Sequence, residues 1–197
     1  MASSLINSYE ELDLLMQEII FNADGEDILR DAIATHIFAE SLGLLYMKRN
    51  KFGRCQDDGT IYINEGGWKP IGRNESKFGK FAGSICGSKV YSMFAQSINY
   101  LHRDTDKKSQ VFTLLTHENK FYLIKNSDNI ELIKGLFDLY DTNNIAPYQS
   151  YTTPNIHKVF FNHPLVIYRS WDIDKNFKFS EVINCILHLV NEAVSEG

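Results

Sequence analysis

The sequence is poor in the features that mark secreted and metal-binding proteins. Its three cysteines, Cys55, Cys86 and Cys185, are odd in number, lie far apart and form no C-x-x-C pair, and no histidine stands at zinc-ligand spacing. Scattered cysteines of this kind argue against a disulfide framework and against a zinc site, and they are typical of a reducing compartment. We therefore expect a cytoplasmic protein without a metal or another cofactor.

Long apolar runs and lipid-attachment signals are also missing. No stretch approaches the length of about 18 apolar residues that a membrane span needs, and the first residues lack the basic and apolar regions of a secretory signal. Ala2 replaces the glycine that myristoylation requires, and the C-terminus carries no prenylation box. We expect a protein that does not insert into a membrane.

Positive charge is scarce as well. The chain has a formal net charge of -5 and an isoelectric point of about 5.7, which gives no overall attraction to a phosphate backbone. The basic run Lys48-Arg49-Asn50-Lys51 is short, and we interpret it as a solvated turn after a strand. Nucleic acid is therefore not an expected partner.

Length and composition fit one domain with an appendage. The 197 residues, 44% of them hydrophobic, are enough for a packed core. Residues 8–11 (Ser-Tyr-Glu-Glu) have the form of a capping box, and the apolar residues after them recur at helical spacing. A second helix is expected to begin near Glu26. We predict an N-terminal helical extension over residues 1–33 and a single α+β domain over residues 34–197.

The pattern over residues 34–49 admits two structures. A helix can continue to Gly43, where the glycine would end it. Alternatively, residues 36–39 and 44–47 form a pair of strands with a turn between them. Both alternatives stay open, because periodicity cannot separate helix from strand in so short a segment.

A polar segment follows. Residues 50–76 are rich in Gly, Asp, Asn and Lys, with one apolar strand at residues 60–63. This composition is typical of a hairpin or of a long surface excursion. We expect a surface excursion of the domain at about residues 50–76.

The next element is expected to be a helix from about residue 76 to residue 101. Three glycines within it, Gly79, Gly83 and Gly87, would each cost roughly 1 kcal/mol of helix propensity relative to alanine. If these glycines instead mark a loop, the helix begins only near Ser88.

The C-terminal half contains clearer patterns. Two alternating apolar runs, residues 111–116 and 121–125, flank a four-residue polar loop, which predicts a β-hairpin. An amphipathic helix should follow directly. Residues 164–168 predict a buried strand, and residues 180–190 predict a second amphipathic helix. We therefore predict an α+β fold with a mostly antiparallel sheet flanked by helices.

Glu118-Asn119-Lys120 resembles the E-x-K part of a restriction-type nuclease site. In such a site the carboxylate binds Mg²⁺ and the lysine steadies the attacking water. The two side chains belong on a strand, with an aspartate at its edge. Here the triplet falls in the hairpin loop, and Asp104 or Asp106 would supply the aspartate. Glu118 and Lys120 are candidate catalytic residues on this hypothesis and ordinary exposed loop residues otherwise.

Cys86 is the other candidate for catalysis. It follows Gly83-Ser84 and precedes a predicted helix, whose N-terminus can activate a thiolate. The base would be His102, His157 or His163. The simpler interpretation is that a single cysteine among small residues serves packing.

The order of elements resembles the longin-like or SNARE-like fold if residues 34–49 form the strand pair. The similarity is greatest to the small sedlin-type subunits of the transport protein particle (TRAPP), in which a hairpin leads to a helix ending in a tyrosine patch, then to Asn-Pro-Phe-Tyr, to Pro-Ile and to a phenylalanine. The matching segments here are residues 115–121, 136–140, 146–148 (Ala-Pro-Tyr), 154–156 (Pro-Asn-Ile) and Phe160. Ala146 stands where the family has asparagine, and the hairpin loop lacks the family's glycine.

This resemblance implies a non-catalytic scaffold or adaptor subunit of a cytosolic vesicle-tethering complex, peripheral to endomembranes and acting on a Rab-type GTPase. Its partners would be other protein subunits and a small GTPase. The aromatic candidates for partner contacts are Phe137, Tyr140, Tyr148 and Trp171. The alternative function is a small microbial enzyme, either a metal-dependent nuclease or a cysteine hydrolase, or a toxin-immunity-type inhibitor.

Overall fold

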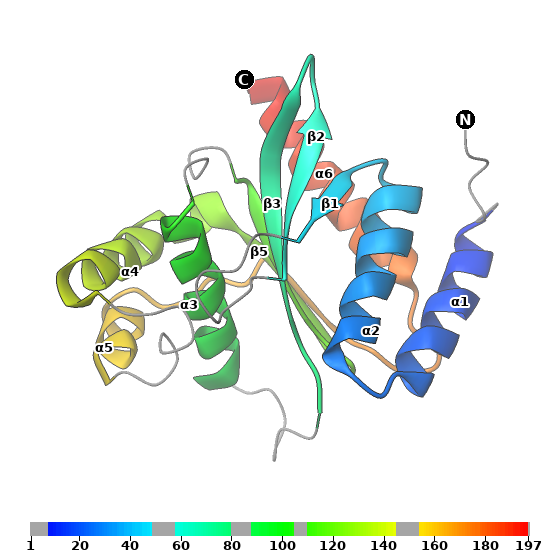
Figure 1. Cartoon of the computed structure of the whole chain (residues 1–197), viewed down its shortest axis with the longest axis horizontal. Coiled ribbons are helices and arrows are strands. Elements are labelled where there is room, and N and C mark those ends of the chain that lie inside the picture. The colour runs from blue at the N-terminus through cyan, green and yellow to red at the C-terminus, as the bar shows by residue number, and fades with distance from the viewer. Residues whose placement is uncertain (1–7, 49–57, 80–87, 105–109, 145–153, 197) are drawn as a thin grey trace.

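One mixed β-sheet organises the chain (Figure 1). The computed structural model describes residues 8–48, 58–79, 88–104, 110–144 and 154–196. In this part of the chain six strands pair in their sequence order, and every pair is antiparallel except β3 with β4. The strands are β1 (Leu45–Met47), β2 (Gly59–Asn64), β3 (Trp68–Lys77), β4 (Phe112–His117), β5 (Lys120–Lys125) and β6 (Arg169–Asp172). The predicted α+β fold with a mostly antiparallel sheet is confirmed.

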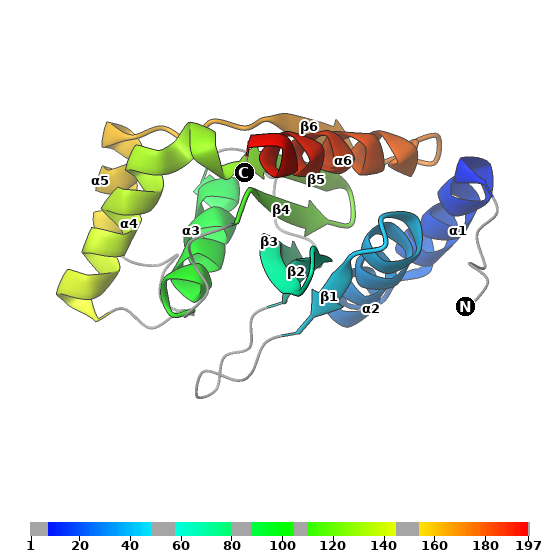
Figure 2. The ribbon, with the colours of Figure 1, turned by 90° about the horizontal axis from the view of Figure 1, so that it is seen from above.

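Helices cover both faces of this sheet (Figures 1 and 2). Helices α1, α2 and α6 lie on one face, and α3, α4 and α5 lie on the other. The helices are α1 (Tyr9–Asn22), α2 (Glu26–Ala32), the π-helix η1 (Ile33–Ser41), α3 (Ser88–His102), the 3-10 helix η3 (Asn126–Asn129), α4 (Ile130–Asn143), α5 (Pro154–Asn162) and α6 (Phe179–Glu196). Among the described residues, no helix has the length and apolar character needed to cross a membrane.

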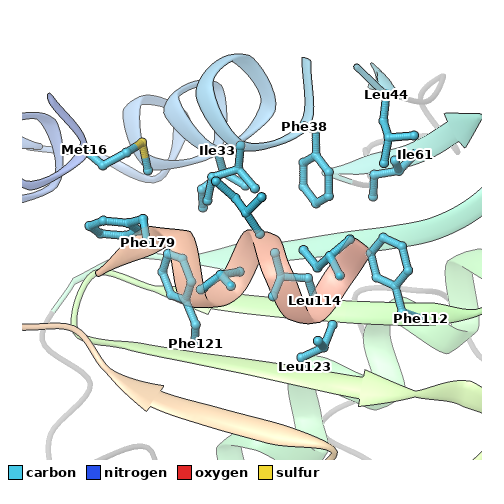
Figure 3. Packing of buried hydrophobic residues seen from close by; sticks show 14 of the residues in the cluster. Met16, Ile33, Phe38, Leu44, Ile61, Phe112, Leu114, Phe121, Leu123 and Phe179 are labelled. Atoms are coloured by element: carbon cyan, nitrogen blue, oxygen red, sulfur yellow. The ribbon is translucent and has the colours of Figure 1, made fainter. Parts of the chain in front are cut away.

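Each helical layer has its own apolar core. Figure 3 shows the first core, in which Met16 of α1 and Phe179 of α6 lie among residues of the sheet such as Leu114. The second core joins Phe94 of α3 to Leu115 on the opposite face. Successive residues of β4 therefore pack alternately into the first and the second core, because side chains alternate between the two faces along a strand.

The N-terminal helices pack onto the domain. The Ser8 side chain accepts a hydrogen bond from the Glu11 amide at 3.2 Å, so the predicted cap of α1 is formed. Leu12 and Leu29 are fully buried in the first core. Residues 8–33 thus contribute to the core of the α+β domain.

Asp13 joins α1 to α6. Its Oδ1 accepts a hydrogen bond from the Phe179 amide at 2.7 Å, and its side chain is buried. The first amides of a helix have no partner within the helix, so this contact caps α6 from a distance. We expect Asp13→Ala to lower the free energy of unfolding by about 2 kcal/mol in urea titrations. Asp13→Asn, which keeps an acceptor oxygen, should lose less; equal losses in the two variants would contradict the capping role.

The helical alternative is correct for residues 34–41. Helix α2 passes directly into η1, and Gly43 then turns the chain with a φ of +64°. Beyond it, only Leu45–Met47 forms a strand, so the alternative strand pair is not formed. The resemblance to the longin-like fold requires that strand pair, and it stays a prediction.

The described part of the polar segment, from residue 58 onward, contains the hairpin alternative. Residues 59–64 and 68–77 are β2 and β3, and most of the second half of β3 is buried. Helix α3 begins at Ser88, as the loop alternative requires, while Gly83 and Gly87 lie outside the described residues. Because α3 returns the chain along the sheet, β4 runs parallel to β3.

The two C-terminal predictions have different outcomes. The helix predicted over residues 180–190 lies within α6, and its apolar residues Val182, Ile183, Ile186, Leu189 and Val190 are buried. The buried strand predicted over residues 164–168 is wrong, because this segment is not a strand and is largely exposed. The strand begins later, at Arg169.

Candidate active site

Glu118 lies in the β4–β5 turn and Lys120 is the first residue of β5, and the two side chains make separate contacts. The Glu118 carboxylate accepts a hydrogen bond from the Gly79 amide at 2.9 Å. Lys120 Nζ pairs with Asp172 Oδ1 on β6 at 3.0 Å. The two side chains thus have different partners on opposite sides of the turn.

The other catalytic candidates are also dispersed. Asp104 is buried and lies 3.5 Å from an Arg73 nitrogen, while Asp106 lies outside the described residues. Cys86 also lies outside them, so the geometry of a thiol site is not described. His102, one candidate base for that thiol, contacts the Asp141 carboxylate at 2.9 Å.

The aromatic partner candidates lie mainly in the interior. Tyr140 is 3% exposed, and its hydroxyl donates to a backbone carbonyl of α3 at 2.6 Å. Trp171 is 9% exposed and belongs to the first core. Phe137 is partly buried and lines a groove beside α4, and Tyr148 lies outside the described residues.

His117 and Glu118 hold the chain where it leaves β3. Gly79 has a φ of +99°, its amide donates to Glu118, and its carbonyl lies 3.2 Å from His117 Nε2. We expect Glu118→Ala to lower the free energy of unfolding by about 1 kcal/mol, because the Gly79 amide loses its acceptor. Lys120→Ala, which removes an exposed pair, should change it by less than about 0.5 kcal/mol. Urea titration measures both, and the reverse order would contradict this role.

A second E-x-K triplet lies on a strand. Glu75, Ser76 and Lys77 end β3, and residues two apart on a strand project from the same face. Glu75 is 2% exposed. Lys77 Nζ donates to Glu75 Oε1 at 2.6 Å and to the Ser76 carbonyl at 3.0 Å. This triplet therefore has the strand placement that a restriction-type nuclease site requires.

Asp58, directly before β2, lies beside this triplet. Strand pairing sets Gly59 opposite Asn74, and the same register places Asp58 opposite Glu75. Asp58 is 5% exposed, and its Oδ2 accepts a hydrogen bond from the Ser76 amide at 2.5 Å. The pairing of β2 with β3 thus brings together two buried carboxylates, one just before β2 and one on β3.

Helix α2 adds charged groups to the same place. Glu26, its first residue, has Oε1 3.9 Å from Lys77 Nζ. Arg30, one turn later, has Nη1 3.5 Å from Asp58 Oδ1. We call the following residues the Glu75 cluster: Glu26, Asp58, Glu75 and Lys77.

The pKa values reflect an excess of negative charge in this cluster. Burial, followed by the charge of Asp58, raises the pKa of Glu75 to about 8. Burial also raises the pKa values of Asp58 and Glu26. Burial alone would lower the pKa of Lys77, but the three carboxylates around it outweigh burial and raise it. The Glu75 carboxyl therefore keeps a proton near neutral pH while Lys77 stays charged.

The donor set of the cluster fits Mg²⁺. This ion prefers oxygen ligands, keeps several waters and commonly uses only one or two carboxylates of the protein. Asp58 and Glu75 supply two such carboxylates, and a bound cation would replace the retained proton. Within the described ranges, no group of three or more His, Cys, Asp or Glu side chains is arranged to hold a metal ion. The cluster is therefore suited to a partly hydrated Mg²⁺ rather than to a fully enclosed ion.

The sequence patterns missed these residues because β3 does not look like a strand. Its sequence, Trp-Lys-Pro-Ile-Gly-Arg-Asn-Glu-Ser-Lys, has almost no aliphatic residues, yet the four residues from Arg73 to Ser76 are buried. One signal was available, an aspartate followed by a second E-x-K triplet. It became meaningful only once residues 68–77 were known to be a strand.

Comparisons with protein-family models, with curated proteins and with solved structures found no match. The Glu75 cluster thus places the Lys77 ammonium group among the carboxylates of Glu26, Asp58 and Glu75.

Proposed function

We propose that this chain is a Mg²⁺-dependent nuclease of the restriction type, in which Asp58, Glu75 and Lys77 act on a phosphodiester bond. The observation that carries the proposal is the E-x-K triplet on β3 with a buried aspartate opposite its glutamate. A purely structural lysine would need one carboxylate partner. The presence of three carboxylates with raised pKa values favours a site that receives a cation.

Each group has a role that follows from its position. Asp58 and Glu75 would hold the cation. A bound Mg²⁺ lowers the pKa of a coordinated water and offsets the charge of a phosphate. Lys77 orients the attacking water and stabilises negative charge that develops on the phosphate, since the surrounding carboxylates keep it protonated. Arg30 positions Asp58 through their 3.5 Å contact.

Local charge supports a nucleic-acid substrate, although the whole chain is acidic. Residues 48–54, which lead toward Asp58, contain four Lys or Arg and no acidic residue. Residues 77–89, which begin at the end of β3, contain three lysines and no acidic residue. Positive segments that adjoin a phosphodiester site in the sequence favour binding of a polyanion. The proposal therefore replaces the expectation, based on net charge alone, that nucleic acid is not a partner.

The scaffold function stays a prediction and comes second. It depends on a family resemblance that requires a strand pair over residues 36–47, where the chain forms η1 and then β1. Its aromatic candidates Tyr140 and Trp171 are buried. The Glu75 cluster has no role in a scaffold, whereas the nuclease proposal gives a role to three of its four members, Asp58, Glu75 and Lys77.

The decisive experiment measures metal binding and cleavage on the same preparation. We expect calorimetry at pH 8 to detect Mg²⁺ binding, and supercoiled plasmid, single-stranded DNA or RNA to be cleaved only when Mg²⁺ or Mn²⁺ is present. Glu75→Gln protein, purified in parallel, controls for contaminating nucleases because it should bind Mg²⁺ much more weakly and cleave at least about a hundredfold more slowly. Absence of both binding and cleavage in the unmodified chain would overturn the proposal.

A further inference from the structure

Lys77 supplies the Glu75 cluster with a positive charge of its own. Its Nζ donates to Glu75 Oε1 at 2.6 Å and to the Ser76 carbonyl at 3.0 Å, and Glu26 Oε1 lies 3.9 Å away. Among the residues that the structure describes, Lys77 is the only cation within ion-pair distance of Glu75. In the metal-free protein the positive partner of Glu75 is therefore an ammonium group.

Asp58 and Glu75 are held by groups of different mobility. Asp58 accepts a hydrogen bond from the Ser76 amide at 2.5 Å, and Ser76 is fixed in β3 by pairing on both sides. Its other oxygen lies 3.5 Å from Arg30, whose side chain is 10% exposed. Glu75 is 2% exposed, but its partner Lys77 is 23% exposed at its side chain. One carboxylate thus has fixed partners, and the other has a partner that can move.

A divalent cation and the Lys77 ammonium group compete for the same carboxylate. Mg²⁺ lies about 2.0–2.1 Å from its oxygen ligands, so an ion on either oxygen of Glu75 would lie only a few ångströms from Lys77 Nζ. Two cations at that separation repel each other strongly where little water screens them. The lysine stem is long and flexible, so its ammonium group can move toward solvent while the backbone of β3 stays in place.

We propose that Lys77 blocks the metal-free site by pairing with Glu75, and that its ammonium group leaves Glu75 for the solvent side when a divalent cation binds. This inference rests on the proposed Mg²⁺ site of Asp58 and Glu75. Once released from the carboxylate, the ammonium group is free to contact the phosphate of a substrate. Lys77 thereby takes up its catalytic position only after the cation is present.

Acetylation of lysines with acetic anhydride, followed by mass spectrometry, tests this exchange on the full chain without a substrate. At pH 8 we expect Lys77 to react at least about tenfold faster with saturating Mg²⁺ than with a chelator, because the hydrogen bond to Glu75 is then lost. Stabilisation of the fold by a bound ion would have the opposite effect, since it suppresses local opening. A faster reaction therefore reports release of the side chain.

Lys120 is the internal control for the labelling. Its side chain is 31% exposed, close to the 23% of Lys77, and its Nζ also pairs with a carboxylate, Asp172 Oδ1, at 3.0 Å. Asp172 does not belong to the Glu75 cluster, so Lys120 should react at the same rate with and without Mg²⁺. In Glu75→Gln protein, which should bind Mg²⁺ much more weakly, Lys77 should not respond to the metal.

Calorimetry on the same samples separates this inference from the proposed function. Mg²⁺ binding without a change in the labelling of Lys77 would overturn the exchange and leave the nuclease proposal in place. Absence of Mg²⁺ binding would overturn the exchange together with the metal site on which it rests. An equal Mg²⁺ response at Lys120, or at Lys77 in Glu75→Gln protein, would also overturn the exchange, because the effect would then arise outside the site.

Discussion

Lys77→Met and Glu75→Gln are each expected to lower the rate of Mg²⁺-dependent phosphodiester cleavage by at least about a hundredfold. Lys77→Met removes the ammonium group that orients water and stabilises the phosphate, while it keeps most of the side-chain volume. Glu75→Gln removes a carboxylate that holds the cation. The measurement is a single-turnover cleavage rate at saturating Mg²⁺.

Metal binding separates the two variants. Lys77→Met should still bind Mg²⁺, because Asp58 and Glu75 remain, whereas Glu75→Gln should bind it much more weakly. The Lys77 side chain is only 23% exposed and pairs with Glu75, so its replacement can also change the stability of the fold. Retained Mg²⁺ binding in Lys77→Met would show that the site is intact and that the rate loss comes from the missing ammonium group. Circular dichroism and urea titration on each variant establish that the fold is kept.

The first E-x-K triplet provides the matched controls for this experiment. Lys120→Ala and Glu118→Gln change the same residue types at the same spacing, but in the β4–β5 turn and at the first residue of β5. We expect cleavage rates within about twofold of the unmodified chain, because neither residue belongs to the Glu75 cluster. If these variants lost cleavage while Lys77→Met kept it, the catalytic residues would be Glu118 and Lys120 and not the Glu75 cluster.

The metal-free protein is expected to lose stability as the pH rises from 5 to 8. Burial and the charge of Asp58 raise the pKa of Glu75 to about 8, whereas a glutamate in an unfolded chain titrates near about 4.3. Between these values the folded protein holds a proton that the unfolded chain has released. The free energy of unfolding then falls by up to about 1.4 kcal/mol per pH unit, for a total on the order of 3 kcal/mol.

The other members of the Glu75 cluster do not reverse this fall in the free energy of unfolding with rising pH. The pKa values of Asp58 and Glu26 are also raised by burial, which adds to the loss in the same direction. The raised pKa of Lys77 affects stability only above about pH 10, where a free lysine titrates. Urea titration in the presence of a chelator, from pH 5 to pH 8, measures the total change.

Glu75→Gln isolates the contribution of the Glu75 carboxyl to the pH dependence of stability. The variant should be more stable than the unmodified metal-free protein at pH 8 and should show a much shallower dependence on pH. Added Mg²⁺ should stabilise the unmodified chain more at pH 8 than at pH 6, because binding must displace the proton on Glu75. Identical pH profiles for the two proteins would show that Glu75 is not the group that titrates.

Several elements were predictable because their signals are local. The helices around residues 8–20 and 180–190 repeat apolar residues at helical spacing, and both are found. The hairpin of β4 and β5 has two alternating runs around a short polar loop, and it is also found. In each case the apolar periodicity and the residues that end the element lie in one short segment. The element can therefore be predicted without knowing which distant segment it packs against.

Strand β3 was not predicted, for the opposite reason. Arg73, Asn74, Glu75 and Ser76 are buried polar residues, and a local pattern assigns such residues to a loop. They are stable in the sheet because β2 and β4 flank them and other residues satisfy their side chains. Asn74 Nδ2, for example, donates to the Leu114 carbonyl at 2.9 Å.

The sequence by itself determined that this is an α+β protein with amphipathic helices and an antiparallel hairpin, because periodicity and turn residues act within a few residues of one another. Only the tertiary structure decided which E-x-K triplet lies on a strand. It alone brings Asp58, Glu75 and Glu26 together, from the residue before β2, the end of β3 and the start of α2. Strand register and helix packing, which act between distant segments, raise the pKa of Glu75 and leave residues 164–168 exposed.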